Sequence, residues 1–256
     1  MRSLLSLVTL PFVLTGPLAG CAPAADPQDE FAAEAANLDT PGAKADGAST
    51  YYELTADLRR CPSPLCGGWF LRGINRPMTR CHDGTHAEVC YTPAFDWSEG
   101  NLSEEQRAEL LDASFKDAMA GGVQALVRGR FEPTNSTTPR PEMGVFVIAE
   151  AWVVEGGGVA DGVFVRVKDN GLRCFAAPCP SLTETVLNTP RVADIAEVDF
   201  TPAGLSEREV EECTAEMATP EGIMVAGYRY RVYDNDQTAK ARTATAAYRR
   251  LVDIAQ

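Results

Sequence analysis

The densest group of side chains suited to metal binding lies in one ten-residue segment. It holds two thiols and both imidazoles of the chain: Cys81, His82, His86 and Cys90. Zinc prefers these ligands, but four of them in so short a loop, two of them adjacent, rarely meet at one tetrahedral ion. The Asp83-Gly84 pair between them is typical of a tight turn. We therefore expect a hairpin closed by a disulfide, and no metal site.

Two aspartates, Asp96 and Asp199, each precede a segment with helix-start signals. Paired carboxylates hydrolyse glycosidic bonds when they stand within about 10 Å of each other. Asp is also a common turn residue, and the sequence contains no G-x-S-x-G, H-E-x-x-H or strand-linked glycine-rich phosphate loop. We expect turn and brace roles for both, and no catalytic residues, cofactor or enzymatic activity. A hydrolase that uses Asp96 and Asp199 is the alternative.

The chain has eight cysteines, and six of them lie in pairs that are close in sequence. An exported chain meets oxidants, so we expect each pair to form a local disulfide worth about 2 to 3 kcal/mol. The expected bonds are Cys61 with Cys66, Cys81 with Cys90, and Cys174 with Cys179. Cys213 remains as a free thiol on the helix face of Val210 and Met217, where it is expected to act as a small buried apolar group.

Five aromatic side chains are candidates for a carbohydrate platform: Trp69, Phe70, Tyr91, Trp97 and Trp152. Aromatic rings at strand positions belong more often to the core, and we expect that role here.

The N-terminus has the features of an export signal. Arg2 precedes an apolar run over residues 4–14, which is too short to span a bilayer core of about 20 residues. The following Leu18-Ala19-Gly20-Cys21 resembles the lipobox of bacterial lipoproteins. The resemblance implies a signal peptide over residues 1–20 and lipid attachment to the Cys21 sulfur. Ala22, in place of Asp, implies the outer membrane, on its periplasmic face or at the cell surface.

Residues 21–48 form an acidic segment with Phe31 as its one aromatic residue. Such a segment cannot bury enough apolar surface to fold alone, so we expect a flexible tether. The whole chain carries a formal net charge of -13, which argues against nucleic acid as a partner.

Several residues of the remaining chain recur at a constant spacing. Arg60, Cys61, Cys66 and Asn75 recur 113 positions later as Arg173, Cys174, Cys179 and Asn188. Asp96 and Ser103 recur 103 positions later as Asp199 and Ser206. Ordered matches of this kind are typical of an internal repeat. We expect two tandem units, residues 49–155 and 156–256, in which the recurring polar residues act as turns and braces or form two equivalent sites.

Each unit has signals for about five strands and one helix. Alternating valines between Val163 and Val167 favour a strand. Ser103 with Gln106, and Ser206 with Glu209, have the spacing of a capping box at a helix start. The pattern predicts an α+β fold in which two duplicated β-rich units pack about a pseudo-two-fold axis.

Two motifs resemble an uncharacterised family of cysteine-containing lipoproteins common in myxobacteria. They are R-C-P-S-P-L-C-G-G-W-F from Arg60 and G-L-R-C-F-A-A-P-C-P-S from Gly171, and the resemblance covers most of residues 51–254. It implies the location and fold of that family. It implies no activity, because the family is of unknown function.

Together these features favour a membrane-anchored, disulfide-stabilised envelope lipoprotein that acts as a non-enzymatic binding or surface module. Its partners are the membrane, through the lipid, and a protein or glycan ligand. A passive structural protein of the envelope is a further alternative beside the hydrolase.

Overall fold

The computed structural model describes residues 50–132, 143–234 and 237–252, so the expected signal peptide, Cys21 and the tether lie outside the described residues. None of the described helices is long and apolar enough to cross a membrane. The described chain contains two α-helices, α2 (Glu104–Ala120) and α3 (Glu207–Met217), and a 3-10 turn, η3 (Thr201–Ala203). It contains fourteen strands: β1 (Thr50–Ala56), β2 (Trp69–Gly73), β3 (Thr79–Arg80), β4 (His86–Ala87), β5 (Cys90–Thr92), β6 (Phe95–Asp96), β7 (Ala125–Glu132), β8 (Val145–Glu155), β9 (Val163–Asp169), β10 (Leu182–Val186), β11 (Val192–Ile195), β12 (Val198–Asp199), β13 (Ile223–Asp234) and β14 (Gln237–Leu251).

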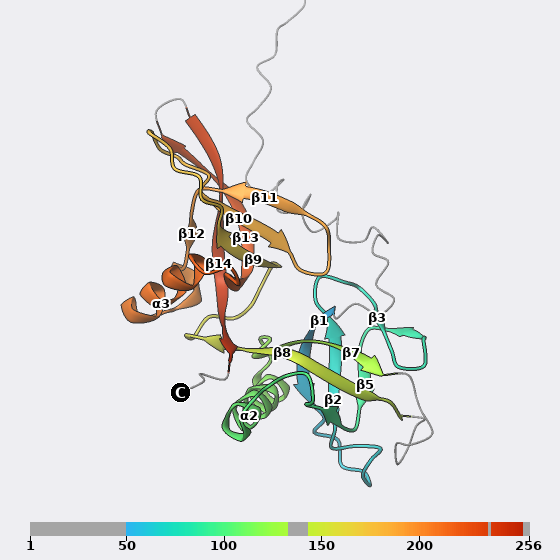
Figure 1. Cartoon of the computed structure of the whole chain (residues 1–256). Coiled ribbons are helices and arrows are strands. Elements are labelled where there is room, and N and C mark those ends of the chain that lie inside the picture. The colour runs from blue at the N-terminus through green and yellow to red at the C-terminus, as the bar shows by residue number, and fades with distance from the viewer. Residues whose placement is uncertain (1–49, 133–142, 235–236, 253–256) are drawn as a thin grey trace, which may run out of the picture.

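Twelve of these strands form one sheet, and most of its neighbours are antiparallel (Figure 1). The order is β11-β10-β9-β13-β14-β8-β7-β1-β2-β5, while β6 pairs with β8 and β12 pairs with β14, both in parallel. Strands β3 and β4 form a small sheet of their own. We call residues 50–155 the first half and residues 156–252 the second half.

The expected fold class, two tandem α+β units, is wrong. Strand β14 is 15 residues long and pairs with β13 along most of its length. Its last residues, Ala247 to Leu251, also pair with β8 from Glu155 to Ala151. The sheet therefore continues across the boundary expected at Gly156. The described chain is mostly β, with only 17 and 11 residues in its two helices, and its architecture is one large antiparallel sheet.

Each helix begins at the expected capping box and covers one half of the sheet. Ser103 accepts a hydrogen bond from the Gln106 backbone, and Ser206 accepts one from the Glu209 backbone. Helix α2 packs through Leu110 on the core of the first half, and α3 packs through Cys213 and Met217 on the core of the second. The valines of β9 face this second core, as their alternation predicts.

A third core lies between the two halves, and we call this region the junction. It is built from side chains on the face of the sheet opposite the helices, because Phe164 and Met224 alternate along their strands with residues of the α3 core. Tyr248 is 1% exposed, and its hydroxyl donates to the Val123 carbonyl at 2.8 Å. The remaining buried members are Ile74, Val123, Leu126, Trp152, Leu187, Ala226 and Ala246.

Two asparagines join the halves by reciprocal contacts, and we call them the asparagine clasp. The Asn188 amide accepts from the Tyr51 backbone N–H at 2.9 Å and donates to the Tyr51 and Ile74 carbonyls at 2.8 and 2.9 Å. The Asn75 amide accepts from the Phe164 N–H at 3.0 Å and donates to the Phe164 and Leu187 carbonyls at 2.8 and 3.1 Å. Each amide thus satisfies a backbone N–H and two backbone carbonyls of the other half, although the Tyr51 and Phe164 carbonyls also accept from the backbone N–H groups of Ile74 and Leu187.

Glycines at two bulges allow the strands to approach closely. The register shifts at Gly129 in β7 and at Gly227 in β13. A Cβ atom would lie 2.0 Å from the Val147 carbonyl oxygen at the first position and 1.9 Å from the Thr243 carbonyl oxygen at the second. Only glycine fits such contacts, and bulges of this kind bend a sheet.

Candidate ligand-binding site

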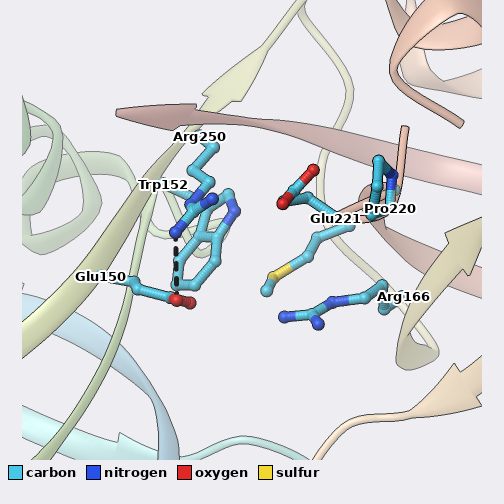
Figure 2. Close-up of a pocket in the computed structure, with 8 residues that line it drawn as sticks. Glu150, Trp152, Arg166, Pro220, Glu221 and Arg250 are labelled. Carbon is cyan, nitrogen blue, oxygen red and sulfur yellow. Dashed lines mark hydrogen bonds and ion pairs between the residues drawn. The ribbon is translucent and has the colours of Figure 1, made fainter. Parts of the chain in front are cut away.

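A pocket of about 220 Å³ opens at the junction, and we call it the junction pocket (Figure 2). One wall comes from β8 and β14 and the other from β9 and the start of β13. It is lined by Glu150, Trp152, Arg166, Pro220, Glu221, Gly222, Met224 and Arg250. The lining residues come from distant parts of the sequence, so only the folded junction brings them together.

One wall carries a carboxylate shared between two guanidinium groups. Glu150 accepts from Arg250 at 3.0 Å and from Arg128 at 3.1 Å. The side chains of Glu150, Arg128 and Arg250 are between 21% and 37% exposed, so water screens the two ion pairs only in part. Two cations share one anion here, which leaves this wall with a positive charge.

Arg166 extends from the opposite wall into the pocket (Figure 2). Its guanidinium donates to the Tyr51 hydroxyl at 2.5 Å and lies 5.7 Å from the centre of the Tyr51 ring. No carboxylate among the described residues pairs with it. Because a guanidinium has five N–H donors, Arg166 keeps donors for a further acceptor.

Tyr51 connects the pocket to the asparagine clasp. Its backbone is held by Asn188, and its ring centroid lies 5.7 Å from that of Trp152. Burial raises the pKa of Tyr51 above its ordinary value, although Arg166 and Arg128 oppose this change. Tyr51 is therefore a neutral partner for Arg166 at neutral pH.

The remaining wall is the loop before β13. Glu221 is exposed and makes no hydrogen bond or ion pair with any residue that the structure describes. Gly222 has a φ of +64°, and a Cβ atom there would lie 2.3 Å from the Val167 carbonyl oxygen. This close approach holds the loop against β9.

A second hollow of about 410 Å³ shares Glu150 and Arg250 with the junction pocket. It continues along β8 and the end of β14, past Gly100, Asn101 and Val252. Ligand sites for molecules of drug size occupy roughly 300–1,000 Å³. The two adjoining hollows together reach this size, so the junction has room for more than a single small group.

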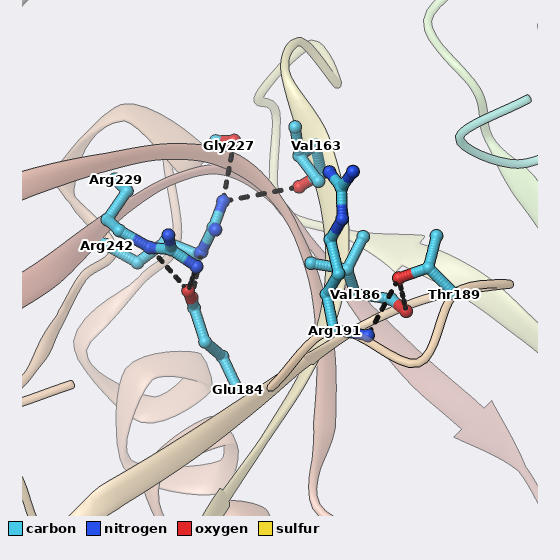
Figure 3. A network of polar contacts seen from close by, with 8 residues as sticks. All are labelled: Val163, Glu184, Val186, Thr189, Arg191, Gly227, Arg229 and Arg242. Atoms are coloured by element: carbon cyan, nitrogen blue, oxygen red, sulfur yellow. Dashed lines mark hydrogen bonds and ion pairs between the residues drawn. The ribbon is translucent and has the colours of Figure 1, made fainter. Parts of the chain in front are cut away.

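The most deeply buried charges lie elsewhere and brace the second half (Figure 3). Glu184 accepts from Arg242 at 2.5 Å and also from Arg229, and the side chains of Glu184 and Arg242 are fully buried. Arg242 also donates to the Gly227 carbonyl at 2.8 Å. Burial alone would raise the pKa of Glu184, but the two arginines outweigh it and lower the pKa. This triad joins β10, β13 and β14 and opens into no pocket described above.

The structure contains three disulfides with the pairing expected from local spacing: Cys61–Cys66, Cys81–Cys90 and Cys174–Cys179. Cys213 is a buried free thiol, and burial, together with nearby glutamates such as Glu216, raises its pKa to about 12. Such a thiol is protonated at neutral pH and is a poor nucleophile.

Asp96 and Asp199 lie in separate turns. Each carboxylate accepts from the backbone N–H two residues further on, that of Ser98 or Thr201, at 2.8 and 2.9 Å. Asp96 is paired with Val147 of β8, and Asp199 with Thr243 of β14. The paired part of β8 and β14 runs from Ala151 and Leu251 at one end to Glu155 and Ala247 at the other. Val147 lies four residues beyond the first end and Thr243 four residues beyond the second, so the two partners are about twelve residues apart along the strands, on the order of 40 Å at about 3.3 Å per residue. The hydrolase alternative therefore has no geometric support from this pair.

The recurring arginines and the histidines also take local positions. Arg173 pairs with Asp169 at 2.7 Å in an exposed turn, whereas its sequence match Arg60 makes no contact that the structure records, and Arg59 pairs with Asp57 instead. His82 and His86 lie in the segment closed by the Cys81–Cys90 disulfide. Among the described residues, no group of three or more His, Cys, Asp or Glu side chains is arranged to hold a metal ion.

The aromatic residues take core and bracing positions rather than a common platform. Trp69 and Trp97 pack against the first core, and Trp152 is 4% exposed in the junction. Phe70 and Tyr91 pack against each other beneath the Arg59 guanidinium, next to the first disulfide loop.

Sequence reasoning missed the charged lining of the junction pocket. Glu150, Arg166 and Arg250 belong to three different strands and to no short motif. The one signal for Arg166 was its place between Val165 and Val167, which puts a charge on the strand face opposite a core.

Comparison with known families gives one result. The family model of a domain of unknown function, DUF6748, matches residues 50–253, almost the whole described chain. No curated protein and no solved structure matches. The family is uncharacterised, as the sequence motifs implied. The match covers well over half of the chain, and the protein therefore belongs to the family defined by this domain of unknown function, DUF6748.

Proposed function

We propose that this protein is a lipid-anchored module of the bacterial cell envelope that binds a ligand in the junction pocket without transforming it. The lipobox-like segment that ends at Cys21 supports the anchor. Three disulfides support an exported protein, because such bonds persist in oxidising compartments. The outer membrane is the proposed location, on the ground of Ala22.

The observation that carries the binding function is the placement of Arg166 and Arg250 on opposite walls of one pocket. Arg250 stands on the end of β14, which pairs with β8 of the first half, and Arg166 stands on β9 of the second half; the third core and the asparagine clasp hold the two halves together. A site held in this way loses little conformational entropy when a ligand binds. The pocket also favours binding over a passive structural role, which needs no concave site lined by charged groups.

Two experiments test the proposal. Mass spectrometry of the N-terminal peptide from membranes should show lipid on Cys21, and a Cys21→Ser variant should appear in the soluble fraction. An unmodified, uncleaved N-terminus would contradict the anchor.

The binding function is tested by NMR on the purified mature chain with Cys21→Ser. A panel of acidic, neutral and basic sugars and amino acids is titrated while the Trp152 indole N–H resonance is followed. We expect at least one compound to shift this resonance, while the indole resonances of Trp69 and Trp97 stay in place. If no compound moves any junction resonance, the binding function is wrong.

A further inference from the structure

The charged side chains in and beside the junction pocket add up to one positive charge. Arg166, Arg250, Glu150 and Glu221 line the pocket, and Arg128 lies just outside the lining, where it donates to Glu150. A local surplus of one positive charge is notable in a chain whose formal net charge is -13. It matches a ligand group with one negative charge better than a phosphate, which carries nearly two at neutral pH.

The hydrogen-bond donors of Arg166 favour a carboxylate as the negatively charged group of the ligand. Its one acceptor among the described residues is the neutral Tyr51 hydroxyl. The planar fork of a guanidinium matches the two oxygens of a carboxylate, and such a bidentate pair is stronger than a hydrogen bond between neutral groups. Arg250 faces the same space from the other wall, and one bond to Glu150 leaves it donors as well.

Glu221 requires that the ligand also carry a group that can donate a hydrogen bond. It lines the same pocket and accepts no hydrogen bond from any described residue. A ligand that carries only a carboxylate would be repelled by it. A ligand with an ammonium or hydroxyl group beside the carboxylate would instead donate to it.

We propose that the junction pocket binds a carboxylate between Arg166 and Arg250 while Glu221 accepts a hydrogen bond from an adjacent ammonium or hydroxyl group. This rests on the proposed binding function and names its ligand class. Two sources present this chemistry, an acidic sugar such as a hexuronate and an amino acid. A volume of about 220 Å³ suits one such residue, and the adjoining hollow at Arg250 would hold the next part of a longer ligand.

Matched pairs of ligands test the proposal on the mature Cys21→Ser chain. Glucuronate is compared with glucose, and alanine with alaninamide, because each pair differs mainly in the carboxylate. Inorganic phosphate serves as the doubly charged anion. The Trp152 indole resonance reports binding in the pocket, and titration calorimetry gives the affinity.

We expect the acid of at least one pair to bind at least tenfold more tightly than its neutral partner and than phosphate. Glucuronate would identify the sugar as the source, and alanine the amino acid. Arg166→Gln should weaken that acid at least tenfold, and Arg166→Lys should restore only part of the loss. Arg208→Gln is the matched control, because Arg208 lies exposed on α3 and pairs with Glu212.

If compounds shift the Trp152 resonance but neither acid binds more tightly than its neutral partner, or if phosphate binds most tightly, the pocket binds a ligand but not a carboxylate. Unchanged affinity of the acid for Arg166→Gln would also overturn the proposed carboxylate site. Glu221→Gln provides a second variant at an exposed position, and it should weaken whichever acid binds, glucuronate or alanine, more than acetate, which has no ammonium or hydroxyl group to donate to Glu221. Equal effects on that acid and on acetate would refute the role of Glu221.

Discussion

Replacement of Asn188 by alanine should lower the free energy of unfolding by about 4 kcal/mol. The change removes an amide that satisfies one backbone N–H and two carbonyls at the junction, each bond contributing about 1 kcal/mol. Asn188 also has a φ of 62°, a conformation that costs alanine about 1 kcal/mol or more. Such a loss is a large share of the roughly 5 to 15 kcal/mol that stabilises a typical domain.

The assay is urea unfolding followed by tryptophan fluorescence, with the melting temperature as a second measure. At about 2 to 4 °C per kcal/mol for a chain of this size, the melting temperature should fall by about 8 to 16 °C. Asn75→Ala should lower the free energy of unfolding by a similar amount, because Asn75 makes the same three kinds of contact and has a φ of 55°. Asn188→Gly should cost about 3 kcal/mol, since glycine accepts the backbone conformation.

Asn101→Ala is the matched control. Asn101 is exposed, has a φ of 29° and makes no hydrogen bond with the described residues, so its replacement measures backbone strain alone. If Asn188→Ala and Asn75→Ala cost no more than Asn101→Ala, the asparagine clasp does not hold the halves together, and the reasoning is refuted.

Three further predictions follow from the buried groups and the disulfides. Glu184→Gln should cost about 3 to 5 kcal/mol at pH 7, because it leaves Arg242 buried without its anion. Since the pKa of Glu184 is lowered in the folded state, the stability from the triad is present above the ordinary pKa of 4.5 and is lost as pH falls through the folded pKa. The gap between wild type and Glu184→Gln in urea unfolding should therefore narrow below pH 4.5, and a gap independent of pH would contradict the triad. Iodoacetamide at pH 8 should leave Cys213 unlabelled in the folded protein and label it in urea, because the pKa of this buried thiol is raised to about 12; rapid labelling of the folded protein would show an accessible thiolate instead. Replacing Cys174 and Cys179 together by alanine should cost about 2 kcal/mol through the entropy of the short loop, and an unchanged melting temperature would show that the loop is restrained without the bond.

Local features of this fold were predictable, whereas long-range pairing was not. The capping boxes at Ser103 and Ser206 and the alternating valines of β9 act within a few residues, and the structure has helices and a strand there. The pairing of Ala247 to Leu251 with β8 depends on chain segments nearly a hundred residues apart, and no local pattern encodes it. That pairing makes one sheet of what the spacing of motifs suggested were two units.

The same limit applies to the site. The recurrence of Asp96 as Asp199 reflects a turn before each helix, in which the carboxylate accepts from the backbone N–H two residues further on. Glu150 and Arg250 belong to different strands and gain meaning only from their 3.0 Å contact across the sheet. The spacing of Asn188 from Asn75 indicates a recurring residue, but it does not specify that the Asn188 amide donates to the Tyr51 and Ile74 carbonyls.

The most direct test of a preformed junction is hydrogen exchange at two backbone amides. The N–H groups of Tyr51 and Phe164 donate to Asn188 and Asn75, so they should exchange only when the whole protein unfolds. Their exchange free energies, measured by NMR, should equal those of Val127 and Val225 in the centre of the sheet. Exchange free energies several kcal/mol lower at Tyr51 and Phe164 would show that the halves separate in the native protein, and the junction pocket would then not be preformed.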